Sequence, residues 1–210
     1  MRRLLLPLLL CACASTSQSR ERFTDVHREK LAASIAKTSS VASDHQWRDV
    51  PAYDGELVNA YIEIPRGTSD KYEFDLAKNE RVVDRVLDPS LGGYPTNYGF
   101  IPQTMAFDGD PYDVLVLGPP LEGGTIVKTR IVALMHMDDE KGPDPKLVLV
   151  PVDTELTLDD AEKKRIATWF DGYKKFEPDK WAKVTGWSDA AAAKAALDSV
   201  VEFYRVERSR

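Results

Sequence analysis

Hydrophobic and polar residues alternate in several short runs in the middle of the chain. In AYIEIPRG, Ile62 and Ile64 fall on one face of an extended segment, and Tyr61 and Glu63 fall on the other. Similar β-rich runs lie between Gly- and Pro-rich breaks at residues 71–76, 81–87, 113–118, 125–137 and 146–152. Because no helical pattern separates these runs, they favour an antiparallel barrel or sandwich over a βαβ sheet.

The hydrophobic period becomes helical after Pro151. Thr157 is expected to cap a first helix and Ser188 a second one. The apolar stripe of the first helix consists of Ile166, Trp169, Phe170 and Tyr173. That of the second consists of Ala193, Leu197, Val200, Val201 and Tyr204. The predicted fold is therefore of the α+β class: a small antiparallel β-barrel flanked by C-terminal α-helices.

The N-terminal sequence MRRLLLPLLLCACASTSQSR has the layout of a secretory signal, with basic, apolar and small-residue regions in order. Its apolar stretch is too short to span a bilayer as a helix. We expect a signal peptide over residues 1–14, a flexible and partly helical tether over 15–46, and one domain over 47–210. The expected location is exported, either periplasmic or anchored through a lipidated Cys13. Cleavage after Ala14 without lipid, an organellar transit peptide and a cytoplasmic protein remain alternatives.

Composition and charge narrow the function classes. Both cysteines lie before residue 14, so the predicted domain has no disulfide or thiolate chemistry. The net charge of −6 argues against a nucleic-acid surface, which needs clustered basic residues. The 43% of hydrophobic residues is enough for a core in a chain of 210 residues.

An acidic cluster, DGDPYDV, is the first candidate for chemistry. If the segment is extended, Asp108 and Asp110 point to the same side, and a turn at Pro111 could bring Asp113 to join them. The spacing does not fit a helix–loop–helix calcium loop, which needs glycine at its sixth position and glutamate at its twelfth. Taken alone, the cluster could equally be a solvated acidic turn.

A second acidic segment, HMDDEKGPDPKLVLVP, adds Asp138, Asp139 and Asp144 between two apolar runs. The candidate ligands are carboxylate oxygens. The predicted domain has no cysteine, and its histidines show no ligand spacing, so Mg²⁺ or Mn²⁺ is favoured over zinc. Basic and phenolic residues accompany these carboxylates, namely Lys71, Arg85, Tyr94, Tyr98, Lys146, Tyr173 and Lys174. Together the two groups predict binding of a small phosphate ester or anhydride. The usual glycine-rich nucleotide loops are missing.

Seven segments in consistent order resemble the soluble inorganic pyrophosphatases, a family built on an OB-like barrel. They are YIEIPRG, KYEFD, VVDRVL, YPTNYGFIPQT, DGDPYDVLVL, DDEKGPDPKLVLVP and GYKKFEPDKWAKVTGW. DGDPYDV matches the signature D-x-D-P-x-D-V of that family, and the resemblance runs from about residue 47 to residue 187.

The resemblance implies a role for each matching residue. The catalytic residues would be Asp110, Arg85, Tyr98, Tyr173 and Lys174. The substrate-binding residues would be Lys71, Glu73, Arg85, Tyr94, Lys146, Tyr173 and Lys174. The metal ligands would be Asp108, Asp113, Asp139, Asp144 and Glu63, holding several Mg²⁺ ions, with Mn²⁺ possible.

The implied reaction is metal-dependent hydrolysis of inorganic pyrophosphate to two phosphates, by direct attack of a water or hydroxide that bridges two metal ions. The implied partners are pyrophosphate and further copies of the chain, since the family forms dimers or hexamers, and no nucleic acid. Two other functions stay open at this point: hydrolysis of larger phosphoanhydrides, and a non-enzymatic phosphate- or metal-binding module.

Overall fold

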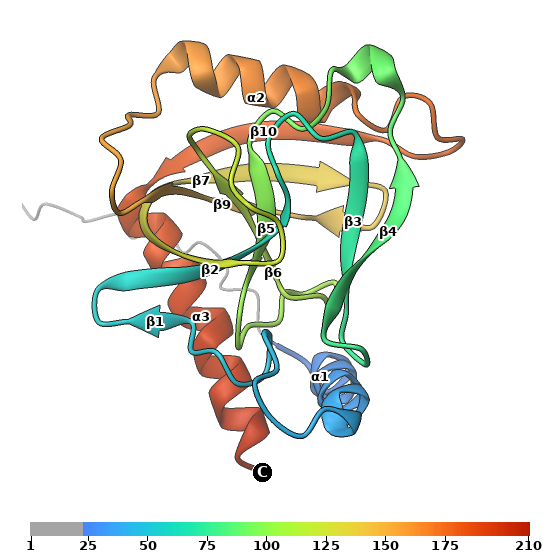
Figure 1. Ribbon diagram of the computed structural model, residues 1–210, viewed down its shortest axis with the longest axis vertical. Coiled ribbons are helices and arrows are strands. Elements are labelled where there is room, and N and C mark those ends of the chain that lie inside the picture. The colour runs from blue at the N-terminus through green and yellow to red at the C-terminus, as the bar shows by residue number, and fades with distance from the viewer. Residues whose placement is uncertain (1–22) are drawn as a thin grey trace, which may run out of the picture.

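The computed structural model describes residues 23–210, and its centre is a closed β-barrel (Figure 1). The ring runs β2–β5–β6–β9–β7 and closes because β2 also pairs with β7. These strands are β2 (Leu57–Ile64), β5 (Asn97–Ile101), β6 (Tyr112–Val116), β7 (Ile126–Asp139) and β9 (Lys146–Pro151). Three further strands extend the sheet: β1 (Tyr53–Asp54) on β2, and β8 (Gly142–Pro143) and β10 (Ala182–Asp189) on β7. A separate hairpin is formed by β3 (Asp70–Asp75) and β4 (Glu80–Val86).

The long strand β7 closes the barrel. Its beginning pairs with β2, its middle with β9 and its end with β10. The register shifts between Ile131 and Ala133, and such a bulge bends a strand and increases its twist. This bend lets one strand pair with β2, β9, β8 and β10, and it carries Asp139, its last residue, to the mouth of the barrel.

The predicted α+β class with an OB-like barrel and C-terminal helices is confirmed, with one difference in strand direction. β6 and β9 pair in parallel, with Val114 opposite Leu147, whereas the other strand pairs are antiparallel. A parallel pair needs a crossover, and β7 provides it by passing between the two strands in the chain. The alternation pattern missed β5 and β10, because neither contains a clear run of alternating apolar residues.

The first C-terminal helix, α2 (Asp160–Gly172), was predicted with the correct stripe but the wrong cap. Ile166 and Phe170 are buried against the end of the barrel, beside Met135 and Ala182. The cap is Asp159, whose carboxylate accepts a hydrogen bond of 2.8 Å from the amide of Glu162, and not Thr157. The charge of an Asp cap also interacts favourably with the helix dipole.

The second C-terminal helix, α3 (Ala190–Arg208), also begins one residue later than expected. Asp189 caps it by accepting from the amide of Ala192, whereas the predicted cap Ser188 bonds the ring of His136 at 2.7 Å. Ala193, Leu197 and Val200 pack into the barrel core, as predicted from the stripe. None of the described helices is long and apolar enough to cross a membrane.

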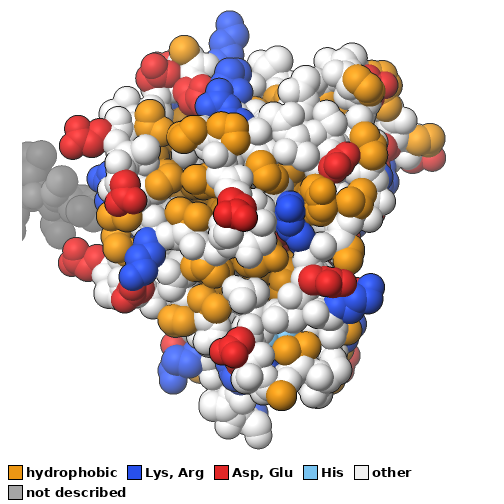
Figure 2. Space-filling view, viewed as in Figure 1, with side chains coloured by type: hydrophobic (Ala, Val, Ile, Leu, Met, Phe, Trp, Pro, Cys, Tyr) orange, Lys and Arg blue, Asp and Glu red, His pale blue; other side chains and the backbone are white. Residues whose placement is uncertain are grey.

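The interior of the barrel is closely packed around β2. Gly99 on β5 is required there, because a Cβ at this position would lie 1.8 Å from the carbonyl oxygen of Tyr61. Ile62, Val114 and Leu147 from neighbouring strands form the centre of the main apolar cluster. At the surface, acidic and basic side chains are interspersed among hydrophobic ones on the face shown in Figure 2.

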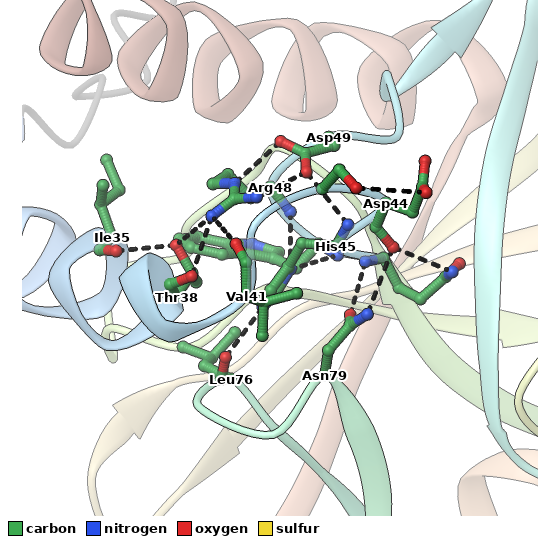
Figure 3. Close-up of polar contacts among 12 residues, drawn as sticks. Ile35, Thr38, Val41, Asp44, His45, Arg48, Asp49, Leu76 and Asn79 are labelled. Atoms are coloured by element: carbon green, nitrogen blue, oxygen red, sulfur yellow. Dashed lines mark hydrogen bonds and ion pairs between the residues drawn. The ribbon is translucent and has the colours of Figure 1, made fainter.

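The segment before the barrel packs against it in the part that the structure describes. Helix α1 (Asp25–Lys37) is followed by a short 3₁₀ turn, η1 (Thr38–Ser40), and both lie within the range 15–46 for which a tether was expected. His45 is fully buried, and its Nε2 lies 2.8 Å from the carbonyl of Leu76 on the β3–β4 hairpin (Figure 3). The expected signal peptide, including Cys11 and Cys13, and the first residues of the tether lie outside the described residues.

Candidate active site

One pocket of about 770 Å³ lies between the β3–β4 hairpin, the mouth of the barrel and the segment after α2. Its volume falls within the range of small-molecule sites. Each predicted site residue except Tyr94 lines it. The residues are Glu63, Lys71, Glu73, Arg85, Tyr98, Asp108, Asp110, Asp113, Asp139, Asp144, Lys146, Tyr173 and Lys174. The fold thus gathers acids and cations that are spread over more than a hundred positions of the chain.

The acidic segment before β6 forms a tight turn and is not extended. The amide of Gly109 donates to the carbonyl of Ala106 at 3.1 Å, and the amide of Asp110 donates to the side chain of Asp108 at 3.0 Å. Gly109 has φ +100°, a conformation that favours glycine. The turn leads into β6, where Asp113 follows on the first half of the strand.

The pKa values show how tightly these carboxylates are crowded. Loss of hydration and the negative charge of Asp113 raise the pKa of Asp108 to about 7. The same two causes raise the pKa of Asp110. Both residues lie at the exposed rim, so water screens their charges more than that of Asp144, whose side chain is 22% exposed. Burial raises the pKa of Asp144 to about 6, against the opposing effect of Lys146.

A buried lysine lies between two of the acids. Nζ of Lys146 is 2.6 Å from Oδ2 of Asp113 and 2.9 Å from Oδ1 of Asp144, and its side chain is 2% exposed. Burial opposes the charge on Lys146, but the carboxylates of Asp113 and Asp144 outweigh burial and raise its pKa well above the ordinary value. The lysine therefore stays charged within the pocket.

A second lysine of the pocket is paired in the same way. Nζ of Lys174 lies 2.8 Å from both Asp139 and Glu140. These hydrogen bonds overcome the cost of burial, so the pKa of Asp139 is lowered and that of Lys174 is raised. Each buried cation thus has carboxylate partners, as charged groups out of water require.

The hairpin side of the pocket carries Lys71 and Arg85. Lys71 pairs with Glu73 and, at 3.1 Å, with Asp84, while Arg85 pairs with Asp84 and, at 2.7 Å, with Glu177. Nε of Arg85 is buried and has no hydrogen-bond partner among the described residues. A buried donor without a partner is costly.

The tyrosines occupy different positions. Tyr98 and Tyr173 line the pocket, whereas Tyr94 is 3% exposed and packs behind Tyr98, with ring centroids 5.5 Å apart. Burial and the charge of neighbouring carboxylates outweigh the nearby lysines and raise the pKa of Tyr173 to about 12, so its hydroxyl remains a hydrogen-bond donor. Tyr94 therefore supports Tyr98 and does not line the site.

Glu63 is the most enclosed of the predicted ligands. It lies on β2 with 7% of its surface exposed, and burial followed by the charge of Asp113 raises its pKa well above the ordinary value. A nearby cation would relieve this crowding of Glu63, Asp113 and Asp144. The donor set of carboxylate oxygens has the chemistry of a site for hard divalent cations.

The side chains are not arranged as a finished metal cage. Within residues 23–210, no group of three or more His, Cys, Asp or Glu side chains is placed so that it could hold a metal ion. The ammonium groups of Lys146 and Lys174 lie where they neutralise the acids instead. Binding a metal would therefore require Asp113 and Asp144 to reorient away from Lys146.

Several pocket residues were missed by sequence reasoning. Glu140 is the neighbour of the predicted Asp139 and pairs with the predicted Lys174, so adjacency was an available signal. His27, Lys30 and Phe107 also line the pocket. The first two come from α1, and nothing in their local sequence indicates a site.

Comparison with known proteins agrees with this geometry. The family model described as inorganic pyrophosphatase matches residues 60–205. An inorganic pyrophosphatase of Aeropyrum pernix is 44% identical over 164 residues, which cover 71% of this chain and 91% of that protein. One from Saccharolobus solfataricus is 41% identical over 156 residues, covering 69% and 90%. The crystal structure of inorganic pyrophosphatase from Thermus thermophilus matches with a TM-score of 0.71 at 39% identity, covering 77% of this chain and 99% of that one. The chain belongs to the inorganic pyrophosphatase family.

Proposed function

We propose that the chain hydrolyses inorganic pyrophosphate to two phosphates with Mg²⁺ as its physiological cofactor. Family membership makes it a metal-dependent diphosphatase. The observation that carries the assignment to this pocket is the meeting of crowded carboxylates with the cations Lys71, Arg85, Lys146 and Lys174 in one cavity. Such a pocket suits a small, highly charged anhydride that binds together with divalent cations.

The residues that would hold the metal ions are Asp108, Asp113, Asp139 and Asp144, with Glu63 contributing through water. Bound Mg²⁺ would offset the negative charge of pyrophosphate and lower the pKa of the attacking water. The chemistry of the donors supports this, because carboxylate oxygens are the protein ligands that Mg²⁺ prefers. Mn²⁺ has similar requirements and is expected to substitute.

Asp110 is the proposed general base. Its carboxylate lines the pocket, and its backbone is held in the turn with Asp108 and Gly109. Burial and the charge of Asp113 raise its pKa, which makes it a better proton acceptor than an ordinary aspartate. Asp110 would therefore take the proton of the attacking water.

The cations and phenols of the pocket are proposed to hold the phosphates. Arg85 lines the pocket with a side chain that is 30% exposed, so its guanidinium can donate to phosphate oxygens. Lys146, Lys174 and Tyr173 offer further donors from the opposite wall. Preorganised donors of this kind stabilise the charge that develops on the leaving phosphate, at about 2–4 kcal/mol each.

Phosphate release from pyrophosphate by the purified protein tests the proposed reaction. We expect turnover with Mg²⁺, none after exhaustive chelation, and inhibition by Ca²⁺, whose larger radius and looser coordination do not suit the same geometry. Tripolyphosphate and a nucleoside triphosphate serve as comparison substrates. Undiminished turnover in chelator, or faster hydrolysis of the longer anhydrides, would contradict the proposal.

We further propose that the chain is exported and forms a homo-oligomer. Export is supported by the Arg2–Arg3 start, the leucine run and the small residues near Cys13. Cell fractionation and mass spectrometry of the mature N-terminus test it: a lipidated Cys13 supports anchoring, Ser15 supports ordinary cleavage, and an intact Met1 in the cytoplasm refutes export. Light scattering of the purified protein gives the number of subunits, and a monomer would refute assembly.

A further inference from the structure

Helix α1 lies before residue 60, where the family match begins, yet it reaches the pocket. Nζ of Lys30 donates a hydrogen bond of 2.8 Å to the carbonyl oxygen of Asp108. We propose that Lys30 is a positioning residue for the Asp108–Asp110 turn and thereby sets the metal affinity of the site. The inference rests on the proposed roles of Asp108 and Asp110.

The lysine contacts the turn along its whole side chain. A Cβ built on Gly109 would lie 2.7 Å from Cδ of Lys30, so the methylene chain of the lysine lies directly over the glycine. The glycine has φ +100° and is the most freely rotating residue of the turn. Lys30 thus covers Gly109 with its stem and holds the preceding carbonyl with its charged end.

The turn has few internal restraints. Three hydrogen bonds close it: from the amide of Gly109 to Ala106 at 3.1 Å, from the amide of Ala106 to Asp110 at 2.8 Å, and from the amide of Asp110 to the side chain of Asp108 at 3.0 Å. Asp108 and Asp110 are both solvent-exposed at the rim. The carboxylates of this turn line the same pocket as that of Asp113, so their negative charges repel one another. A contact from outside the turn therefore contributes substantially to its orientation.

Helix α1 is held firmly enough to provide that contact. The ring of Phe23, just before the helix, stacks on Phe203 of α3 at 3.8 Å and on Phe107 at 4.6 Å between centroids. His27 meets the edge of Phe107, the residue next to Asp108. Leu31 is buried.

The end of α1 is fastened as well. Thr38 and Val41 accept hydrogen bonds of 2.8 and 2.9 Å from the guanidinium of Arg48 (Figure 3). Aromatic packing at its start and this polar network at its end fix α1 relative to the barrel. Lys30, in the middle of the helix, therefore approaches the turn from a rigid support.

The test compares Lys30→Met, Lys30→Arg and Lys37→Met. Methionine keeps the apolar stem and a similar helix propensity, and arginine keeps the charged donor. Lys37→Met is the control, because it removes one positive charge from the same helix at a residue that does not line the pocket. Lys37 is the last residue of α1. Mg²⁺ affinity is measured by calorimetry without substrate, together with urea unfolding in chelator and the Mg²⁺ dependence of kcat.

We expect Lys30→Met to weaken Mg²⁺ binding about three- to tenfold, the range of one ordinary hydrogen bond at an exposed rim. Its activity should recover at high Mg²⁺, its unfolding midpoint should stay unchanged, and Lys30→Arg should restore most of the affinity. Lys37→Met should bind Mg²⁺ as the wild type does. Wild-type affinity in Lys30→Met, an equal loss in Lys37→Met, or no rescue by arginine would overturn the proposal. A wild-type protein that binds no Mg²⁺ would instead refute the proposed metal site.

Discussion

The ammonium nitrogen of Lys146 lies 2.6 Å from a carboxylate oxygen of Asp113, deep in a pocket lined by acids. The same nitrogen is 2.9 Å from Asp144. A positive charge inside the acidic cluster is therefore part of the protein itself.

Lys146→Met should lower the unfolding free energy of the metal-free protein and increase the stability that the protein gains when Mg²⁺ is added. Removal of one partner of a buried ion pair leaves uncompensated charge, at a cost of about 3 kcal/mol of unfolding free energy. Mg²⁺ should restore more stability to the variant than to the wild type, because a cation can then replace the missing ammonium. Turnover should still fall by about a hundredfold, since a phosphate-binding donor is lost.

Urea unfolding in chelator and in Mg²⁺ measures this effect, and Lys164→Met is the control. Lys164 is an exposed lysine of α2. Its replacement should change neither stability nor turnover. An unchanged metal-free stability of Lys146→Met would mean that the ion pairs contribute nothing.

Strand alternation and family motifs predicted the barrel and the pocket because both depend on local signals. Residues such as Asp113 and Lys146 stand in short motifs on or next to strands, and strand pairing brings them together. The turn at Gly109 was harder, since DGD is compatible with both an extended chain and an Asx turn. Tyr94 packs against Tyr98 and is not among the residues that line the pocket, a difference between two neighbouring tyrosines that depends on packing.

The contribution of α1 could not be predicted from the sequence. Its apolar residues form no marked stripe, and it packs through a few large contacts, such as Phe23 on Phe203 and the buried Leu31. Sequence periodicity detects a continuous apolar face but not an isolated aromatic contact across 180 positions. The link between Lys30 and Asp108 depends on that long-range docking.

The stability of the metal-free protein should depend on pH through Asp144. The folded pKa of this carboxyl is about 6, above its ordinary value of 3.8. The folded state therefore binds a proton more tightly than the unfolded state. Its stabilising contribution is complete below about pH 4 and is lost as the pH rises through 6, on the order of 2 kcal/mol in total.

Urea unfolding in chelator from pH 4.5 to 7.5 checks this dependence. Asp144→Asn should make the decrease in unfolding free energy over that range smaller, and the rest of the decrease should come from Asp108 and Glu63, whose pKa values are also raised. Saturating Mg²⁺ should remove the decrease in the wild type. A wild-type curve with the same slope as that of Asp144→Asn would contradict the assignment.

Asp110→Asn and Asp113→Asn should fail in different ways. Asp113 pairs with Lys146 and is assigned to bind metal, so its variant should lose at least about tenfold in Mg²⁺ affinity as well as turnover. Asp110 is assigned to the attacking water, so its variant should bind Mg²⁺ nearly as the wild type does and lose about a hundredfold in kcat. Because the pKa of Asp110 is raised, the acid limb of the wild-type rate profile should lie above the ordinary aspartate range and disappear in Asp110→Asn. Equal metal affinities in both variants would remove this division of roles.

His45→Leu should loosen the segment that carries α1 onto the barrel. Nδ1 of His45 accepts from the amides of Trp47 and Arg48 at 3.2 and 3.1 Å, so the ring proton lies on Nε2 and is donated to the carbonyl of Leu76 (Figure 3). Leucine fills a similar space but leaves these buried backbone groups without partners, at a cost of about 2–4 kcal/mol.

We expect faster hydrogen exchange and proteolysis between residues 38 and 49 in His45→Leu, and little change in the exchange of the barrel strands. Mg²⁺ binding should weaken, because Lys30 loses its support. Ser43→Ala, at an exposed position of the same segment, is the control. Uniform destabilisation of segment and barrel together would show that the two unfold as one unit, and unchanged exchange at residues 38–49 would show that His45 does not hold the segment.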